Sequence, residues 1–123
     1  MEDIYTFEVQ NDEFNRILQG KKDIQVVIND AKRKTLAVGN KITFKRAINE
    51  GESVENEILS VDATIENLMY FNSIEEATQM LGKERCGFKP SSTFDKATDL
   101  FLSKESFEDI EKKGIVAIVF KMQ

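Results

Sequence analysis

Residues 14–44 carry the stretch that decides the fold, FNRILQGKKDIQVVINDAKRKTLAVGNKITF. Its first part places apolar residues at helical spacing and then a glycine, Gly20, which is typical of a helix end. The segments DIQVVIN and GNKITFKRAI are rich in β-branched residues and predict two strands, joined by the polar turn NDAKRK. The stretch therefore predicts a helix, a lysine pair directly beyond it, and two successive strands.

The flanking segments extend this pattern into a small α+β domain. IYTFEV, residues 4–9, alternates like a strand, and Asn11 or Asp12 can cap the short helix that follows. After the turn NEGE, the alternation over residues 53–68 predicts a long strand that crosses the sheet and bends. IVAIVFKM, residues 115–122, is a nearly continuous apolar run, which is typical of a strand buried on both faces.

Helical signals lie between these last two strands. Ser73 and Glu76 have the S-x-x-E spacing of a capping box, and Gly82 follows as a stop. A second helix is expected over FDKATDLFLS, with a further helical turn in ESFEDIEKKG. The predicted order is β-α-β-β-β-α-α-β, an α+β arrangement whose sheet curls into a barrel, with residues 1–123 forming a single domain.

The charge is strongly uneven along the chain. The protein has a formal net charge of -5, yet residues 16–46 hold nine lysines and arginines against two aspartates, a net of +7. Residues 1–15 and 47–123 carry nets of -5 and -7. Such a basic region on an acidic protein can attract a phosphate-bearing ligand locally, although lysines at turns and strand edges can equally serve solubility.

The composition also removes several kinds of chemistry. The chain has no histidine, so Ser-His-Asp triads, Cys-His nucleophiles and histidine-ligated zinc are excluded. The single cysteine, Cys86, is expected to be a packing residue, and its thiol would be reactive only if a cation such as Arg85 lowered its pKa. We expect no metal and no other cofactor. The acidic start of the chain and the lack of a run of about 20 apolar residues predict a cytoplasmic protein that binds no membrane.

Three blocks of the chain occur in an order and spacing that are typical of one family. The stretch FNRILQGKKDIQVVINDAKRKTLAVGNKITF is followed by FNSIEEATQML and then by SKESFEDIEKKGIVAIVFKM. Together they resemble the ASCH domain, a branch of the PUA-like superfamily, over residues 4–122. The resemblance implies a small β-barrel domain of bacterial type, with helices at its openings and a cleft beside a GxK turn. ASCH domains have been proposed to bind RNA, and some members hydrolyse acetylated cytidine.

The chain departs from the family motif GxKxxExR at two positions. It keeps the glycine and the lysine as Gly20 and Lys22, but it has Gln25 in place of the glutamate and Val27 in place of the arginine. Glutamine keeps the size and the hydrogen bonds but loses the charge, and valine loses a guanidinium fork for phosphate or carboxylate. The double change is consistent with loss of the family site or with retuning toward a different ligand.

The first hypothesis is an RNA- or nucleotide-binding module that uses a basic cleft around Lys22. Aromatic rings that could stack on bases are those of Tyr70, Phe71 and Phe88, each of which could equally belong to the core. The residues expected to bind nucleic acid are Lys21, Lys22, Gln25, Lys32, Arg33, Lys34, Lys45 and Arg46.

Two alternatives stay open. The chain could be an amidohydrolase acting on acetylated cytidine, with Lys22 as general base, if burial lowers its pKa, and Glu76 or its neighbour Glu75 as the carboxylate. Glu76 has a competing role in the capping box, and Gln25 lacks the hydroxyl that the family enzymes use, so the sequence leans away from an enzyme. The chain could also be a non-catalytic scaffold or interaction domain that has lost the family site. The sequence does not specify an oligomeric state.

Overall fold

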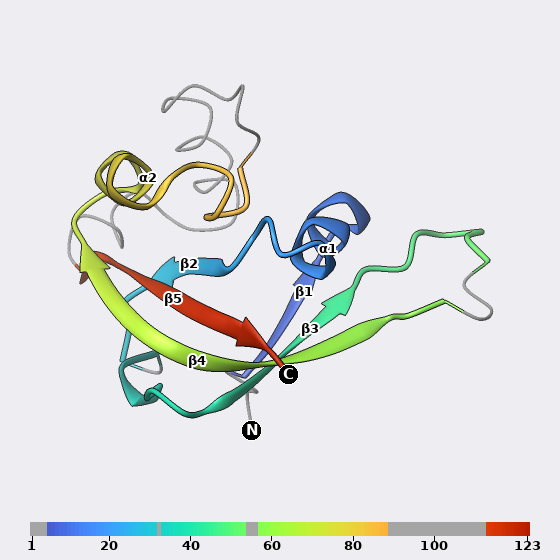
Figure 1. The fold of residues 1–123 in the computed structure, drawn as a ribbon, viewed down its shortest axis with the longest axis horizontal. Coiled ribbons are helices and arrows are strands. Elements are labelled where there is room, and N and C mark those ends of the chain that lie inside the picture. Colours follow the sequence, from blue (N-terminus) through green and yellow to red (C-terminus); the bar gives the residue numbers. More distant parts are fainter. Residues whose placement is uncertain (1–4, 32, 54–56, 89–112) are drawn as a thin grey trace.

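Five strands form one curled sheet with the shape of half a barrel in the computed structural model of the chain (Figure 1). The structure describes residues 5–31, 33–53, 57–88 and 113–123. The sheet order is β1-β3-β4-β5-β2, with β1 parallel to β3 and every other neighbouring pair antiparallel. The expected α+β class and curled sheet are confirmed. The strands are β1 (Thr6–Val9), β2 (Ile24–Ile28), β3 (Lys41–Arg46), β4 (Ser60–Phe71) and β5 (Ile115–Met122).

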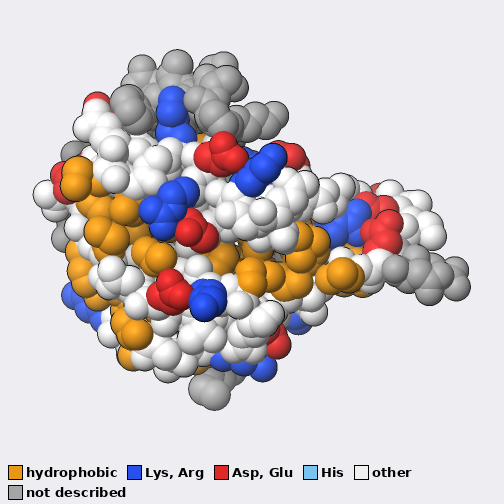
Figure 2. All heavy atoms as spheres, viewed as in Figure 1, with side chains coloured by type: hydrophobic (Ala, Val, Ile, Leu, Met, Phe, Trp, Pro, Cys, Tyr) orange, Lys and Arg blue, Asp and Glu red, His pale blue; other side chains and the backbone are white. Residues whose placement is uncertain are grey.

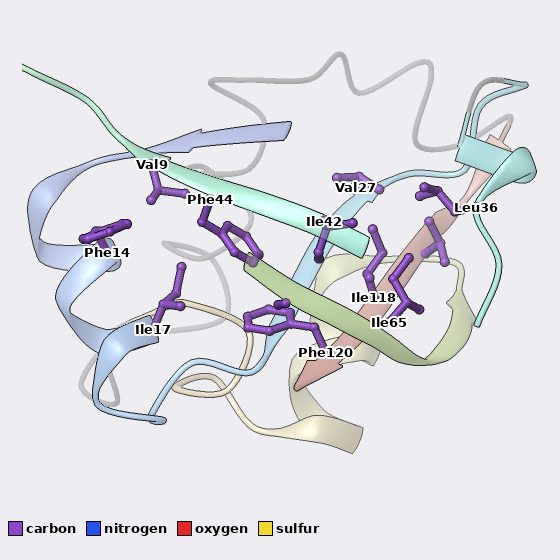
Figure 3. Close-up of a cluster of buried hydrophobic side chains, with 12 residues drawn as sticks. Val9, Phe14, Ile17, Val27, Leu36, Ile42, Phe44, Ile65, Ile118 and Phe120 are labelled. Carbon is purple, nitrogen blue, oxygen red and sulfur yellow. The ribbon is translucent and has the colours of Figure 1, made fainter. Parts of the chain in front are cut away.

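The last strand, β5, is buried on both faces as its apolar run predicts. Its side chains alternate between two hydrophobic clusters, as the period of two in a strand requires. One cluster includes Val116 and Ile118 and packs against α1 (Asn11–Leu18), while the other includes Ile115 and Ala117 and packs against α2 (Ile74–Leu81). Figure 3 shows the first cluster, in which side chains of α1, β2, β3, β4 and β5 meet.

The long strand β4 links the two halves of the sheet and bends as expected. Its first residues pair with β3 and its later residues pair with β5, and the register shifts between Ile65 and Asn67. The strand begins at Ser60 and ends at Phe71, so the prediction of residues 53–68 was displaced. The reason is pairing: the ladder with β3 starts only at Ser60, and β5 provides partners up to Phe71.

The helix ends differ in how well the sequence predicts them. Ser73 caps α2 by accepting a hydrogen bond from the backbone N–H of Glu76 at 3.1 Å, and Gly82 follows the helix, as expected. The cap of α1 was predicted wrongly, because the N-cap is Gln10, whose side chain makes no capping hydrogen bond to a described residue. The side chain of Asn11 instead accepts from Nε of Arg46 at 2.8 Å.

Two smaller points complete the fold. The predicted turn NDAKRK contains a short 3-10 helix, η1 (Arg33–Thr35). The second helix expected over FDKATDLFLS and most of the helical turn expected in ESFEDIEKKG lie outside the described residues. Within the described ranges, no helix has both the length and the apolar character that crossing a bilayer requires.

Candidate functional site

Lys22 lies in the interior of the protein, with a side chain only 2% exposed. Its Nζ atom donates a hydrogen bond to Oε1 of Glu13 and another, at 2.6 Å, to Oε1 of Gln25. The ammonium also lies 6.0 Å from the centre of the Phe44 ring. Burial of an ammonium costs free energy unless the group is paired and hydrogen-bonded. The hydrogen bonds to Glu13 and Gln25 therefore offset the cost of burying Lys22. We call Glu13, Lys22 and Gln25 the lysine cluster.

The end of α1 brings Lys22 back beside Glu13. Gly20 has a φ of 76°, a left-handed conformation that glycine adopts without strain, and it reverses the chain after the helix. The backbone N–H groups of Lys21 and Lys22 then donate to the carbonyl of Arg16 at 2.9 and 3.1 Å. The GKK sequence is therefore a helix C-cap that folds the second lysine under its own helix.

Glu13 is the site residue that sequence reasoning missed. The family motif directs attention to position 25 for a carboxylate, and this chain has a glutamine there. The structure supplies a carboxylate from α1 instead, nine residues before the lysine. The one signal in the sequence is indirect: Glu13 precedes the buried Phe14 in a helix whose glycine cap turns the chain back.

The lysine cluster fixes the orientation of the Gln25 amide. Since an ammonium can only donate hydrogen bonds, the atom that faces Lys22 must be the Gln25 oxygen, and the amide nitrogen points elsewhere. No hydrogen bond within the described residues uses Nε2 of Gln25 or Oε2 of Glu13. The Glu13 side chain is 18% exposed and Gln25 is partly exposed. The cluster thus has one donor group and one acceptor that no other described residue uses.

A turn from a distant part of the sequence closes over the cluster. The carbonyl of Arg85 accepts hydrogen bonds from the N–H groups of Asp23 and Ile24, and the Arg85 guanidinium binds the Asp23 carboxylate at 2.8 and 3.0 Å. This anchoring places Gly87 against the side chain of Lys22. Among the described residues, α1, the GKK turn and β2 therefore supply the lysine cluster, and Phe44 of β3 and the turn at Gly87 pack against Lys22.

Replacing Gly87 with alanine is expected to destabilise the fold by about 2 kcal/mol and to disturb the cluster. Gly87 has a φ of 94°, and a Cβ there would lie 2.9 Å from Oε1 of Glu13 and 3.0 Å from the Lys22 stem. Urea unfolding followed by circular dichroism measures the effect. Gly51→Ala is the matched control, because Gly51 also has a positive φ but a Cβ there meets no atom of the described residues within 4 Å. Equal losses in the two variants would contradict a specific contact at Gly87.

Cys86 is a buried packing residue, and its thiol is not activated. Burial raises its pKa to about 11 from 9.0, and the nearby charges of Lys22 and Arg85 only partly oppose this. Between pH 9 and 11 the unfolded chain loses a thiol proton that the folded chain keeps, so stability falls as the pH rises. We expect a loss of about 2 to 3 kcal/mol over that range that Cys86→Ala lacks, measured by urea unfolding. Parallel pH profiles for the two proteins would contradict it.

Several residues expected to bind nucleic acid are already paired with carboxylates. Arg46 has a side chain only 7% exposed and binds Glu52 at 2.7 Å and Glu57 at 2.9 Å. Arg33 binds Asp30 at 2.9 Å. Desolvation opposes ionisation of Asp30 and on its own would raise the pKa of its carboxyl. The Arg33 backbone N–H, the Arg33 guanidinium and the charge of Lys113 together outweigh it, so the pKa of Asp30 is lowered. A phosphate at Arg46 or Arg33 would have to compete with these carboxylates.

Lysines expected in the same role lie at the surface. Lys21, Lys34 and Lys45 are exposed, whereas Lys32 lies outside the described residues. On the face shown in Figure 2, lysine and arginine side chains lie beside aspartate and glutamate side chains rather than in a continuous basic area. The positive net charge of residues 16–46 is thus partly neutralised in three dimensions, and Lys22 itself is buried.

The remaining candidates separate into surface and core positions. Glu76 is exposed on α2, and no hydrogen bond or ion pair among the described residues joins it to Lys22. Val27 is buried in the core with Ile42 and Leu36 (Figure 3). Of the three aromatic candidates, Tyr70 is 60% exposed, while Phe71 is buried and Phe88 packs partly buried against the second cluster.

The comparisons with known proteins show a fold and no family. No protein-family model matches the chain, and no curated protein matches it. The chain is similar to the crystal structure of the hypothetical protein PH0355, with a TM-score of 0.74, 21% identity, and 96% of this chain and 97% of that chain covered. It is also similar to the solution NMR structure of protein PF0455 from Pyrococcus furiosus, with a TM-score of 0.67, 19% identity, and 96% of each chain covered.

Proposed function

We propose that this chain is an ASCH-like, PUA-related module that binds a nucleotide or an RNA, and that the lysine cluster receives the base. The observation that carries the proposal is the geometry around Lys22. One buried ammonium holds a carboxylate and a carboxamide in fixed orientations, and each keeps a hydrogen-bonding atom that no described residue uses. A donor next to an acceptor is the pattern that pairs with the Watson–Crick edge of a base.

A phosphate is a poorer ligand for the cluster than a base. The charge of Lys22 is balanced by Glu13, whose remaining oxygen is negative and would repel a phosphate. Phosphate contacts fall instead to the exposed Lys21, which directly precedes the cluster residue Lys22 in the chain. Such contacts position a nucleic acid and make its binding depend on salt, while contacts to the base edge give selectivity.

Fluorescence anisotropy with a labelled single-stranded RNA, at two salt concentrations, tests this proposal. Gln25→Leu is expected to weaken binding about tenfold without changing the salt dependence, because it removes one hydrogen-bonded contact. Lys21→Gln is expected to reduce the slope of log K against log salt by about 1. Gln79→Leu, on the exposed face of α2, is the matched control. No binding of the RNA at low salt would remove the proposal, and so would equal RNA affinities of Gln25→Leu and Gln79→Leu.

Hydrolysis of acetylated cytidine is the second candidate, and one observation favours it. Lys22 and Glu13 form a hydrogen-bonded pair that could transfer protons in the attack of water on an amide, which would yield cytidine and acetate. Gln25 provides no nucleophile, so water must attack directly. Incubation with acetylcytidine and chromatography of the products tests this, with Glu13→Gln expected to be inactive. Unchanged substrate with the wild-type protein would eliminate the activity for this compound.

A further inference from the structure

A second hollow lies beyond the opposite end of β2 from the lysine cluster. Lys22 precedes this strand and Asn29 follows it, so the strand separates the two places. The hollow has a volume of about 300 Å³, at the lower end of the range of about 300 to 1,000 Å³ for small-molecule sites. It is lined by Asn29, Tyr70, Phe71, Asn72, Lys113, Gly114 and Ile115.

Backbone geometry at three strand ends builds this hollow. Ile115, the first residue of β5, pairs with Ile28 at the end of β2 and with Phe71 at the end of β4. The N–H of Asn29 donates to the carbonyl of Gly114 at 3.0 Å. Gly114 has a φ of 71°, and a Cβ there would lie 3.0 Å from the carbonyl oxygen of Phe71. The floor is therefore close-packed main chain that a larger side chain at position 114 would disrupt.

The side chains around this floor have exposed or unused groups. Tyr70 is 60% exposed although its neighbour Phe71 is buried, and Asn72 and Lys113 are also exposed. Oδ1 of Asn29 is shielded from solvent and has no hydrogen-bond partner among the described residues. A shielded acceptor without a partner costs free energy, which a ligand donor would recover after a small side-chain rotation.

We propose that this hollow is a second binding site for a base-phosphate unit, with the base on the Tyr70 ring and the phosphate at Lys113. An exposed aromatic ring accepts any base by stacking, and Asn29 and Asn72 line the same hollow with amide groups of the kind that bind a base edge. Lys113 supplies a positive charge at the rim, and a phosphate there would share it with the Asp30 carboxylate that Arg33 also binds. The proposal rests on the proposed function for the class of ligand, and it adds a site that the lysine cluster does not include.

An NMR titration of the ¹⁵N-labelled chain tests the second site separately from the first. The probes are adenosine, adenosine 5′-monophosphate and an eight-nucleotide single-stranded RNA. We expect saturable shifts of the backbone amides of Tyr70, Asn72 and Gly114. Shifts with the mononucleotide support a site for free nucleotides, and shifts with the RNA alone support a site for one unit of a strand.

Two pairs of variants decide which groups carry the binding. Tyr70→Ala is expected to weaken binding here at least tenfold and Tyr70→Phe to restore it, because stacking needs the ring and not the hydroxyl. Tyr5→Ala is the control for an exposed tyrosine elsewhere. Lys113→Gln is expected to weaken binding of the mononucleotide severalfold but not of adenosine, with Lys121→Gln as the control.

The outcomes for the two sites are distinguishable. If the amides of Tyr70, Asn72 and Gly114 do not shift with any probe, or if Tyr70→Ala binds like the wild type, the second site is overturned. Shifts confined to Lys22 and Gln25 would overturn it and leave the proposed function intact. Shifts confined to the Tyr70 region would support the second site and count against the lysine cluster.

Discussion

Replacing Lys22 with methionine is expected to lower the free energy of unfolding by about 3 kcal/mol and to abolish binding of a base at the lysine cluster. Methionine fills much of the volume of the lysine stem but leaves the Glu13 carboxylate, which is only 18% exposed, without its counter-charge. Gln25 also loses the donor that fixes its amide. Urea unfolding followed by circular dichroism suits this protein, because the chain contains no tryptophan.

A double-mutant cycle separates the lost ion pair from lost packing. Glu13→Gln in the Lys22→Met background removes the orphaned charge, so it is expected to recover at least 1 kcal/mol. Lys121→Met, at an exposed position of β5, is the matched control and should change stability by less than about 0.5 kcal/mol. If Lys22→Met is as stable as this control, the buried ion pair has no energetic importance.

Replacing Phe44 with alanine is expected to cost about 4 kcal/mol, the largest loss of any single change considered. The ring is fully buried, lies 4.7 Å from the Phe120 ring and 5.7 Å from the Phe7 ring between centroids, and has Lys22 above it. A domain of this size is stable by only about 5 to 15 kcal/mol, so the variant should be marginal. Urea unfolding measures the loss.

Phe44→Leu is the control for this variant, because it keeps a large apolar side chain and should cost about 1.5 kcal/mol. A loss of less than 1 kcal/mol in Phe44→Ala would show that the aromatic contacts are not central to the core. If Phe44→Leu instead loses as much as Phe44→Ala, the ring itself, through its contacts with Lys22 and Phe120, matters more than the buried volume.

The elements of the fold that could be predicted from the sequence are those with strong local signals. The glycine after α1, the Ser73 cap of α2 and the apolar run of β5 all depend on residues that are close in sequence, and each is confirmed. The bounds of β4 depend on which residues have partners in β3 and β5. That information is not local, so the predicted strand was displaced toward the N-terminus.

The candidate site was less predictable, because the net charge of a sequence segment does not show which of its charged side chains are buried or paired in the fold. Counting cations over residues 16–46 could not show that Lys22 is buried or that Arg46 is enclosed by Glu52 and Glu57. Gln25, where the ASCH motif has a glutamate, was consistent with loss of a site or with retuning toward a different ligand. The structure places Glu13 in contact with the same ammonium, so the cluster keeps a carboxylate from a different element.

The central claim is that the Gln25 amide, held by Lys22, contacts the ligand. The most direct test follows the side-chain Nε2 resonances of Gln25 by NMR while cytidine or adenosine is added. These resonances are assigned by their disappearance in Gln25→Leu, and the Gln79 side chain serves as the internal control. We expect saturable shifts of the Gln25 resonances that are absent in Lys22→Met, while the Gln79 resonances do not change. Unperturbed Gln25 resonances at saturating nucleoside would contradict it.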